Sequence, residues 1–418
     1  MFNKICVVGL GYIGLPTASL LATKNYDVLG VDINPQTVET INRGGIHLYE
    51  PELDVLVRSA VGSGQLHAAV QPGPADVFIV AVPTPFKDNH QADLSYIKAA
   101  TTAIAPHLCD GNLLILESTS PVGTTEKMAR WLTELRPDLI IPTRHMTPSS
   151  ILPREQIYLA HCPERVLPGK ILQELVTNDR IIGGLDASSA VRASDFYNTF
   201  VAGEVLATDS RTAELCKLAE NSFRDVNIAF ANELSIICER LDIDPWTLID
   251  LANRHPRVNI HRPGPGVGGH CIAVDPWFIV DSMPDQARLI RAAREVNEAK
   301  PLHVITKVKE KASRFKSPVI ACLGLSYKAN IDDLRESPAV KIVRTLAQDG
   351  LGRLLVVEPH LKTLPESLAG LNLELTPLTP AVDAADLVVL LVNHRAFRNI
   401  SPNTLKDKVI IDTHGMWR

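Results

Sequence analysis

The sequence lacks three features: a CxxC pair, a large excess of one charge and a long apolar run. Its seven cysteines are scattered and odd in number, which argues against a disulfide framework and a structural zinc site. A formal net charge of -5 gives no reason to expect nucleic acid as a partner. Without a targeting signal or an apolar segment long enough to span a bilayer, we predict a cytoplasmic protein with no membrane insertion.

With 418 residues, 45% of them hydrophobic and 21% charged, the chain has the composition of a globular protein of two or three domains. Up to about residue 200, short apolar runs alternate with helical stretches, which indicates parallel strands joined by crossover helices. The predicted strands are Ile5–Val8, Val28–Val31, Val77–Val82, Leu113–Glu117 and Ile181–Gly183.

From about residue 201 the pattern becomes helical, with a long helix predicted over Ser210–Leu241 and shorter ones over Trp246–Asn253 and Gln286–Ala299. Pro301 is expected to end or kink the last of these helices. A buried apolar stripe is predicted on the long helix, and this block could join two domains and dimerise. The stripe consists of Leu215, Leu218, Val226, Phe230, Leu234 and Ile237.

Alternation returns from about residue 302, with strands predicted at Val319–Leu323, Leu354–Val357, Leu387–Val392 and Val409–Ile411. The sequence therefore predicts an α/β protein of three blocks. Residues 1–200 form an N-terminal Rossmann domain, residues 201–301 an all-helical region, and residues 302–418 a smaller, Rossmann-like domain.

A dinucleotide fingerprint, G-x-G-x-x-G, follows the first predicted strand as Gly9-Leu10-Gly11-Tyr12-Ile13-Gly14. The first glycine permits a tight turn, the second lets a pyrophosphate approach the backbone, and the third allows close packing of helix on strand. The phosphates would be held by helix N–H groups. A glycine-rich turn without a ligand is the alternative, but the strand, the spacing and the position in the chain all favour a cofactor.

Asp32 ends the next strand, about 20 residues further on, where a ribose-binding acid is expected. Its carboxylate would repel a 2′-phosphate, and the next residue is Ile33 rather than arginine, so we predict NAD rather than NADP; FAD remains an alternative. Thr84 and Thr119 follow later strands, whose ends line the cofactor crevice in an open parallel sheet. An ordinary cap or turn explains either threonine equally well.

Lys217, Asn221 and Arg224 lie at i, i+4 and i+7 on the long helix and therefore share one face. This combination suits an anionic substrate and a developing oxyanion, although a solvated polar face is an equally good reading of the three residues alone. A partly buried lysine could also transfer protons near neutral pH.

Cys271 follows Gly268-Gly269-His270 in a Gly/Pro-rich loop without apolar periodicity. Most free cysteines are inert, buried residues, as expected for Cys6, Cys216, Cys238 and Cys322. A cysteine in such a loop is instead a candidate nucleophile, provided that a cation lowers its pKa. A metal site is not expected, because no second ligand lies at a suitable spacing.

Together these motifs resemble the UDP-glucose/GDP-mannose dehydrogenase family over the whole chain. The shared motifs are VVGLGYIGLP, VDIN, VAVPTP, ESTSPVGTT, CPERVLPG, KLAENSFRDVNIAFANEL, GPGVGGHCIAVDP and GLSYKANIDDLRESP. The resemblance implies an N-terminal Rossmann domain, a central helical region that forms a homodimer, and a C-terminal UDP-binding domain. It also implies NAD as cofactor and a UDP-sugar as substrate.

By this resemblance, Cys271 forms a thiohemiacetal and then a thioester during a four-electron oxidation of C6 of the sugar. Lys217 and Asn221 would assist as proton donor/acceptor and oxyanion partners, Asp275 and Glu164 would orient or activate water and Lys217, and Thr119 would lie near the water. The implied cofactor residues also include Tyr12, Ile13, Thr125 and Arg335. The implied substrate contacts are Arg165, Val166, Lys217, Asn221, Arg224, His255, Arg257, Gly268 and Lys328.

Within the family, CPERVLPGK, NRHPRVNI and GMWR are most similar to members that oxidise UDP-N-acetyl-D-mannosamine for bacterial surface polysaccharides such as enterobacterial common antigen. Pro168 stands where UDP-glucose-specific members commonly have a second acid, and His414 stands where relatives tend to have lysine, so no ligand role is assigned to His414. The alternatives are the same chemistry on UDP-N-acetylglucosamine or UDP-glucose, a two-electron hydroxyacid dehydrogenase, and a non-catalytic NAD-binding sensor.

Overall fold

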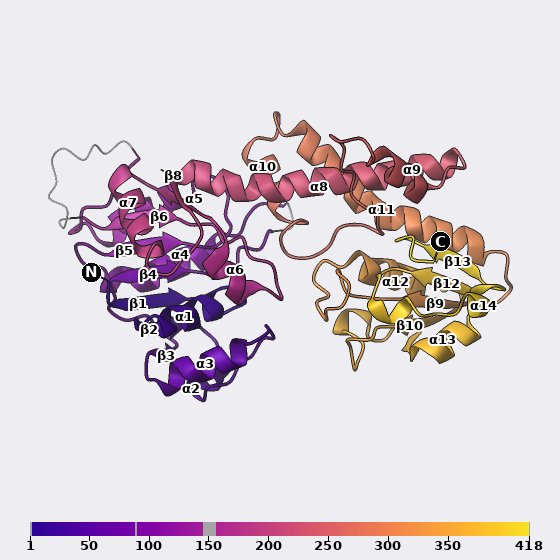
Figure 1. Ribbon diagram of the computed structural model, residues 1–418, viewed down its shortest axis with the longest axis horizontal. Helices are drawn as coiled ribbons and strands as arrows, with labels where there is room; N and C mark the ends of the chain where they lie inside the picture. The colour runs from indigo at the N-terminus through magenta and orange to yellow at the C-terminus, as the bar shows by residue number, and fades with distance from the viewer. Residues whose placement is uncertain (1, 88–89, 145–155, 418) are drawn as a thin grey trace. The chain divides into compact units, whose positions relative to one another are not determined.

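The computed structural model describes residues 2–87, 90–144 and 156–417, and its chain divides into two compact units, Met1–Ala219 and Glu220–Arg418. The boundary lies within the long helix α8 (Ser210–Arg240) (Figure 1). The α/β class is confirmed, with a mainly parallel sheet in each unit. The predicted domain limits at residues 200 and 301 stay predictions. Among the described residues, no helix is both long and apolar enough to cross a membrane.

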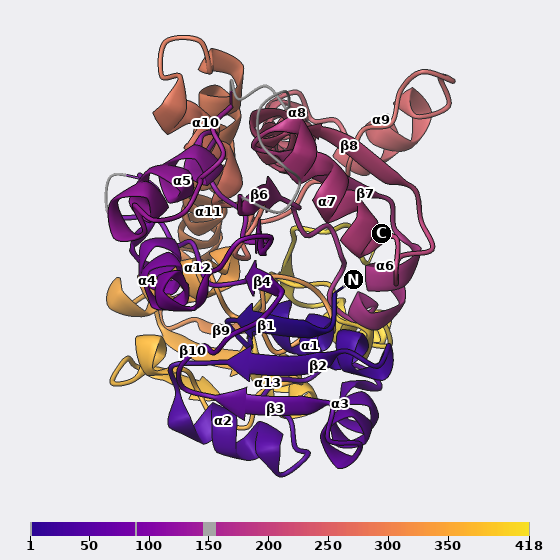
Figure 2. The same ribbon diagram turned by 90° about the vertical axis from the view of Figure 1, so that its left-hand side faces the viewer.

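The first unit is built on a sheet of eight strands in the order β3-β2-β1-β4-β5-β6-β7-β8. Neighbouring strands are parallel except β6 and β7. Figure 2 shows β1, β2 and β3 side by side. The strands are β1 (Lys4–Val8), β2 (Asp27–Val31), β3 (Leu66–Ala69), β4 (Val77–Val80), β5 (Leu113–Leu116), β6 (Tyr158–His161), β7 (Arg180–Gly184) and β8 (Val205–Asp209).

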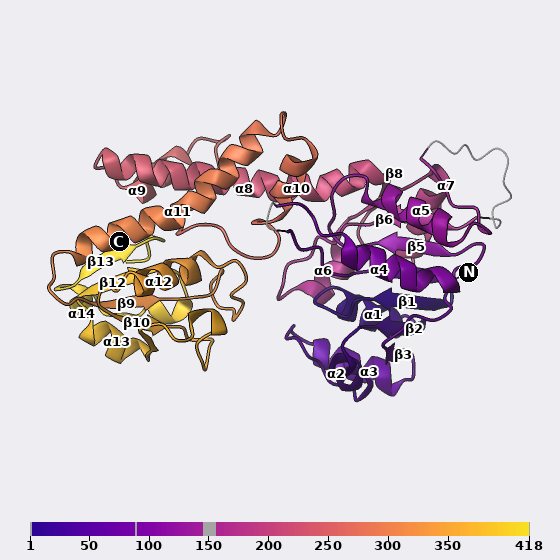
Figure 3. The ribbon, with the colours of Figure 1, turned by 180° about the vertical axis from the view of Figure 1, so that it is seen from behind.

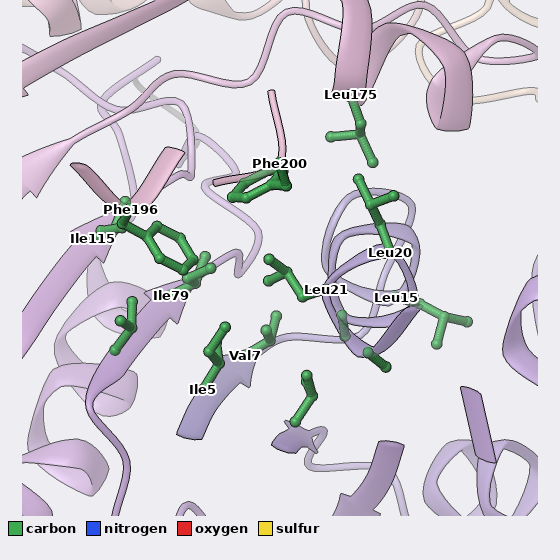
Figure 4. Packing of buried hydrophobic residues seen from close by; sticks show 14 of the residues in the cluster. Ile5, Val7, Leu15, Leu20, Leu21, Ile79, Ile115, Leu175, Phe196 and Phe200 are labelled. Atoms are coloured by element: carbon green, nitrogen blue, oxygen red, sulfur yellow. The ribbon is translucent and has the colours of Figure 1, made fainter. Parts of the chain in front are cut away.

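Helices cover both faces of this sheet, so successive residues of one strand enter different cores. Ile5 and Val7 of β1 pack with residues of α1 and α7, such as Leu21 and Phe196 (Figure 4). Cys6 and Val8 belong to a second core with residues of α4 and α5. Burial on both faces explains the nearly continuous apolar strands. The helices are α1 (Gly14–Thr23), α2 (Pro35–Asn42), α3 (Leu53–Gly62), α4 (Ser95–Ile104), α5 (Thr124–Leu135), α6 (Ile171–Thr177) and α7 (Ala187–Tyr197).

The second unit has a five-stranded parallel sheet in the order β11-β10-β9-β12-β13. Figure 3 shows α11 beside α12 against this sheet. Its strands are β9 (Val319–Leu323), β10 (Arg353–Val357), β11 (Leu373–Leu375), β12 (Leu387–Leu390) and β13 (Val409–Asp412). Its helices are the rest of α8, α9 (Pro245–Ala252), α10 (Asp275–Ser282), α11 (Arg288–Ala312), α12 (Pro338–Gln348), α13 (Leu378–Ala384) and α14 (Pro402–Leu405).

All predicted strands are present, but four short ones were missed: β3, β6, β8 and β11. They contain three to five residues each, and exposed positions interrupt the apolar pattern of β3, β8 and β11. Because β8 lies at residues 205–209, the block from residue 201 is not entirely helical.

The predicted buried stripe on α8 is wrong for Leu215, Phe230 and Ile237, which are exposed. The buried face is instead largely polar, because its side chains pair with α11 in the second unit. Arg294 Nη1 donates to Asp225 Oδ1 at 2.8 Å, and Asn232 Nδ2 donates to Asn297 Oδ1 at 2.9 Å. Hydrogen bonding thus replaces apolar contact as the basis of burial here.

Pro301 does not end its helix, contrary to one of the two expected outcomes. Helix α11 continues through it to Ala312. A proline inside a helix costs about 3 kcal/mol or more. Here the helix packs against both α10 and α12 and Pro301 itself is buried, so tertiary contacts offset that cost.

Candidate active site

The glycine fingerprint forms the turn between β1 and α1, at the carboxyl end of the first sheet. Gly9 has φ +96°, and a Cβ there would lie 2.5 Å from the carbonyl oxygen of Ala81. A Cβ on Gly14 would lie 1.7 Å from the Gly9 oxygen, whereas nothing lies within 4 Å of one built on Gly11. Two glycines are therefore required by the fold, and the space beside Gly11 remains open for a ligand.

Asp32 follows β2 and is tied to the same turn. Its carboxylate accepts hydrogen bonds from Leu10 N at 3.1 Å and from Asn34 N at 2.9 Å, while remaining partly accessible. The neighbouring Ile33 side chain is 85% exposed and uncharged. The open space beside Gly11 and the accessible acid fit the pyrophosphate and ribose of NAD. The end of β2 carries no cation that would bind a 2′-phosphate.

His47 is a neighbour of Asp32 that the sequence analysis missed. Burial lowers the pKa of its imidazole, while the charge of Asp32 acts in the opposite direction. It lies in the segment between α2 and α3, outside any motif, so spacing alone could not have found it.

The remaining predicted cofactor residues differ in their accessibility. Tyr12 is exposed on the glycine turn, and Ile13 is the N-cap residue of α1. Thr84 Oγ1 is buried without a hydrogen-bond partner among the described residues, so the protein itself leaves this hydroxyl unsatisfied. Thr125 is different, because its hydroxyl donates to Glu214 Oε1 at 2.7 Å.

Glu214 is a second residue that sequence reasoning missed. It lies on α8 in the first unit and accepts the backbone N–H groups of Gly123 at 2.5 Å and Thr125 at 2.8 Å. It therefore caps the start of α5, and Thr119, partly buried just before that helix, is held in the same loop. An acid inside a helical run carries no signal of this role.

Glu164 and Lys217 are the predicted catalytic residues of the first unit. Glu164 follows β6, is buried, and accepts a hydrogen bond from Val166 N. Burial raises the pKa of its carboxyl, opposed first by the charge of Lys217 and then by that of Arg180. Lys217 is half-buried on α8 and close enough to Glu164 to act on its charge.

Asn221, Asp275 and Cys271 come together in the second unit. Asn221 Nδ2 on α8 donates to Asp275 Oδ2 at 2.5 Å, and both side chains are buried. Asp275 begins α10, and its N–H donates to the Cys271 carbonyl at 2.8 Å. Val274 N donates to the same carbonyl at 3.0 Å. The half-buried cysteine is thus fixed by a turn that leads directly to a buried acid and amide.

The glycines before Cys271 make room for the chain itself. A Cβ on Gly268 would lie 2.5 Å from the Glu336 carbonyl oxygen and 2.8 Å from the Tyr327 side chain. Gly269 has φ +86°, and its N–H donates to the Arg335 carbonyl at 2.9 Å. The cysteine loop therefore packs closely against residues 327–336, which carry two predicted ligand residues, Lys328 and Arg335.

Most of the predicted substrate contacts are accessible. Arg335 forms an ion pair with Asp333 at 2.6 Å, and Arg165 Nη1 donates to the Asp179 carbonyl at 3.2 Å. Val166 packs partly against the first core. Exposed side chains are found at Arg224, His255, Arg257 and Lys328.

The second sheet contains a counterpart of the cofactor site. Gly324 after β9 has φ +96°, as Gly9 does, and its N–H likewise donates to the last residue of the neighbouring strand, Val357, at 2.8 Å. Glu358 follows that strand and accepts the N–H of Leu325 at 2.7 Å, as Asp32 accepts that of Leu10.

His394 blocks this counterpart of the cofactor site. Asn330 N donates to its Nδ1 at 2.9 Å, so the neutral ring carries its proton on Nε2, 3.1 Å from Glu358 Oε2. His360 and these two residues could in principle ligate a metal ion. The hydrogen bonds already use the ligand atoms of His394, and we interpret the cluster as structural. His414 is partly buried, with Nε2 3.0 Å from the Leu391 carbonyl.

Comparison with known proteins gives one family for the whole chain. Residues 3–201 match the NAD binding domain of the UDP-glucose/GDP-mannose dehydrogenase family, residues 211–299 its central domain, and residues 321–418 its UDP binding domain. An NDP-N-acetyl-D-galactosaminuronic acid dehydrogenase of Ralstonia nicotianae is 60% identical, over 100% of this chain and 96% of its own length.

The names of two further relatives refer to a second substrate, UDP-N-acetyl-D-mannosamine. A UDP-N-acetyl-D-mannosamine dehydrogenase of Yersinia pestis is 54% identical over 100% of both chains. The structure of a UDP-D-ManNAc dehydrogenase from Pyrococcus horikoshii superimposes with a TM-score of 0.88 at 37% identity, covering 99% of this chain and 96% of that one.

Proposed function

The chain belongs to the UDP-glucose/GDP-mannose dehydrogenase family and is an NAD-dependent UDP-sugar dehydrogenase, and we propose that it oxidises C6 of UDP-N-acetyl-D-mannosamine to the uronate in two steps. The proposed product is a building block for a bacterial surface polysaccharide of the enterobacterial common antigen type.

The observation that carries this proposal is the turn that joins Cys271 to Asp275 and Asn221. A two-electron dehydrogenase needs no nucleophile, whereas aldehyde oxidation needs a group that adds to the carbonyl. Cys271 is anchored by its backbone and only partly buried, and the turn that holds it leads to a buried acid and amide that can orient water or stabilise an oxyanion.

NAD, when bound beside Gly11 and Asp32, supplies the hydride acceptor for both oxidations. In the proposed sequence, Lys217 takes the alcohol proton as the aldehyde forms. Cys271 Sγ then adds to C6 and holds the aldehyde as a thiohemiacetal, so that no reactive intermediate is released. The second oxidation yields a thioester, which water oriented by Asp275 and Glu164 hydrolyses to the carboxylate and free thiol.

A second sugar is favoured by one specific observation, the name of the Ralstonia relative at 60% identity. We therefore propose UDP-N-acetyl-D-galactosamine as the alternative substrate. A panel of these UDP-sugars with UDP-N-acetylglucosamine and UDP-glucose, followed by NADH absorbance, distinguishes them by kcat/KM. A preference for UDP-glucose would contradict both proposals.

We also propose a homodimer through the central helices, in the cytoplasm. Three exposed apolar residues of α8, Phe223, Phe230 and Ile237, are spaced by seven residues and so follow one face of the helix. Leu251 of α9 and Leu302 of α11 are exposed as well. Exposed apolar groups at heptad spacing are typical of helices that pair with another copy.

The substitution Cys271→Ser tests the mechanism. A hydroxyl is a much weaker nucleophile than a thiolate, so we expect uronate formation to fall at least ~100-fold, while thermal stability stays unchanged. NADH and uronate are measured together, and wild type should form two NADH per uronate. Cys109→Ser is the matched control, because Cys109 is an exposed thiol outside the site. Full uronate formation by Cys271→Ser would exclude the covalent mechanism.

A further inference from the structure

A buried carboxyl of the first unit has no role in the reaction described so far. Glu117 follows β5, and its side chain is 2% exposed. Its Oε1 accepts a hydrogen bond from Tyr197 Oη at 3.2 Å, whereas its Oε2 has no partner among the described residues. Burying an unpaired carboxylate oxygen is costly, so its retention calls for an explanation.

The surroundings of Glu117 lead directly to the predicted catalytic pair. Strands β5 and β6 are parallel with Leu116 opposite His161, so Glu117 leaves the sheet beside Cys162, two residues before Glu164. Both carboxyls therefore lie at the carboxyl ends of adjacent strands, the edge where ligands bind in such sheets.

The cluster contains two carboxyls but one fully buried cation, Arg180 of β7. Its guanidinium lies 5.8 Å from the centroid of the Tyr197 ring and acts on both Glu117 and Glu164. Lys217 is the second cation near Glu164. If Lys217 gives up its proton, two carboxylates would share one buried cation, and one of them is then expected to become protonated.

We propose that Glu117 is a positioning residue that acts through Glu164: the two carboxyls share Arg180, and while Glu117 holds a proton the charge of Arg180 stays with the ionised Glu164, which acts on water and Lys217. This inference rests on the proposed function of Glu164.

The ionisation of the cluster is consistent with this arrangement. Burial raises the pKa of Glu117 to about 7, with Arg180 opposing and Glu164 adding to the rise. Burial raises the pKa of the Cys162 thiol to about 12 and lowers that of His161 to about 3. The pKa of Tyr197 is also raised by burial. Glu117 is therefore the buried group here that changes charge near neutral pH, and burial raises the pKa of Glu164 as well.

The reaction gives such a pair a use. Oxidation of a primary alcohol by two NAD+ and one water yields a carboxylate, two NADH and three protons. Each proton leaves through the groups around the reacting carbon, beginning with Lys217. If Glu117 takes up or releases one of these protons, the net charge of the pair changes by one while Glu164 keeps the charge that each step needs.

The test is the pH dependence of Glu117→Gln, which removes the charge but keeps the size and an oxygen acceptor for Tyr197. Below about pH 7 Glu117 is protonated and carries no charge, so Glu117→Gln should leave the acidic limb of the kcat profile in place. Above about pH 7 the ionised Glu117 of the wild type competes with Glu164 for Arg180 and lowers kcat, and the variant, which cannot ionise, should lack this decrease. KM for the UDP-sugar should not change. A uniform decrease in kcat at every pH would overturn the proposal, because a merely structural role predicts that result.

Two companion variants serve as controls. Glu117→Asp keeps an ionisable group and should restore a profile close to wild type. Arg192→Gln removes a cation of the first unit that stacks on Phe2 rather than on the cluster, and should leave the profile unchanged.

Infrared spectroscopy of the folded protein gives a readout independent of turnover. The wild type should show a band of a protonated, buried carboxylic acid that disappears as the pH is raised through about 7, and Glu117→Gln should lack it. A wild type without this band would overturn the inference even if Glu117→Gln does not fold. If the band is present but no UDP-sugar is oxidised, the proposed function fails instead.

Discussion

Asp32 and Glu358 occupy equivalent positions in the two sheets, but only Asp32 remains accessible to a ligand. Each acid follows the second strand of its sheet and accepts an N–H from the residue after a glycine with φ +96°. Asp32 remains partly accessible, whereas Glu358 is buried and bonded to His394. The first is free to bind a ribose, and the second stabilises its own domain.

Asp32→Ala should weaken the binding of NAD without unfolding the protein. A hydrogen bond to a charged group is worth about 1.5–3 kcal/mol, so we expect the KM for NAD to rise roughly 10- to 100-fold. Steady-state kinetics at saturating UDP-sugar measure it, with Ile33→Ala as control because that neighbour is almost fully exposed. An unchanged KM for NAD would mean that the acid does not contact the ribose.

His161 should make the protein sensitive to acid. Burial lowers its pKa from 6.5 to about 3. The unfolded chain therefore binds one more proton than the folded chain between these values, and the free energy of unfolding falls as the pH falls below 6.5. Glu117, with its pKa raised from 4.5 to about 7, has the opposite slope, so stability contributed by its protonated form is lost as the pH rises towards 7.

Replacing the ring separates the two effects. Urea unfolding of His161→Leu at pH 5, 6 and 7.5 should show a smaller loss of stability on acidification than wild type does. The control is His107→Leu, because His107 is partly exposed in the turn that follows α4. Equal slopes for His161→Leu and wild type would show that His161 is not neutral in the folded state at pH 5.

At the scale of elements, different glycines of the turn between β1 and α1 serve folding and binding. Gly11→Ala should fold normally, because a Cβ meets nothing within 4 Å, but it should raise the KM for NAD by narrowing the phosphate site. Gly14→Ala should destabilise the whole unit, since its Cβ would lie 1.7 Å from the Gly9 oxygen. Thermal melting and NAD titration of both variants check this. A Gly14→Ala protein as stable as wild type would contradict the packing argument.

Helix α8 shows why a correct helix prediction can still misplace its buried face. Its length was predictable from the absence of breakers over Ser210–Leu241. Its orientation was not, because Asp225 and Asn232 are buried by hydrogen bonds to partners about 65 to 70 residues away on α11. The apolar residues that suggested a core stripe are in part exposed instead.

At the scale of the whole molecule, each of the two units contains a sheet of related topology and its own group of predicted site residues. The first unit holds the glycine turn, Glu164 and Lys217, and the second holds Asn221, Asp275 and Cys271. A sequence comparison of the two sheets gives no repeat, yet their first turns share backbone geometry. The same backbone geometry thus forms part of the cofactor site in the first sheet and holds the structural acid Glu358 in the second.

The proposed dimer predicts a change in assembly state. Phe230 is 52% exposed on α8, and a charge there would be desolvated at an apolar interface, so Phe230→Glu should shift the protein to monomer. Analytical ultracentrifugation of wild type and variant measures it. Val191→Glu, at a 60% exposed position of α7, is the matched control. A dimeric Phe230→Glu protein would place the interface elsewhere.

The sequence by itself determined the α/β class, the strands of both sheets that bear the cofactor motif and its counterpart, and the choice of Cys271. These depend on local rules: apolar runs form buried parallel strands, and a glycine fingerprint needs fixed spacing. Tertiary structure decided the rest. Glu117, Glu214 and His394 owe their roles to partners distant in sequence, because burial and charge depend on which strands become neighbours, and no spacing rule encodes that.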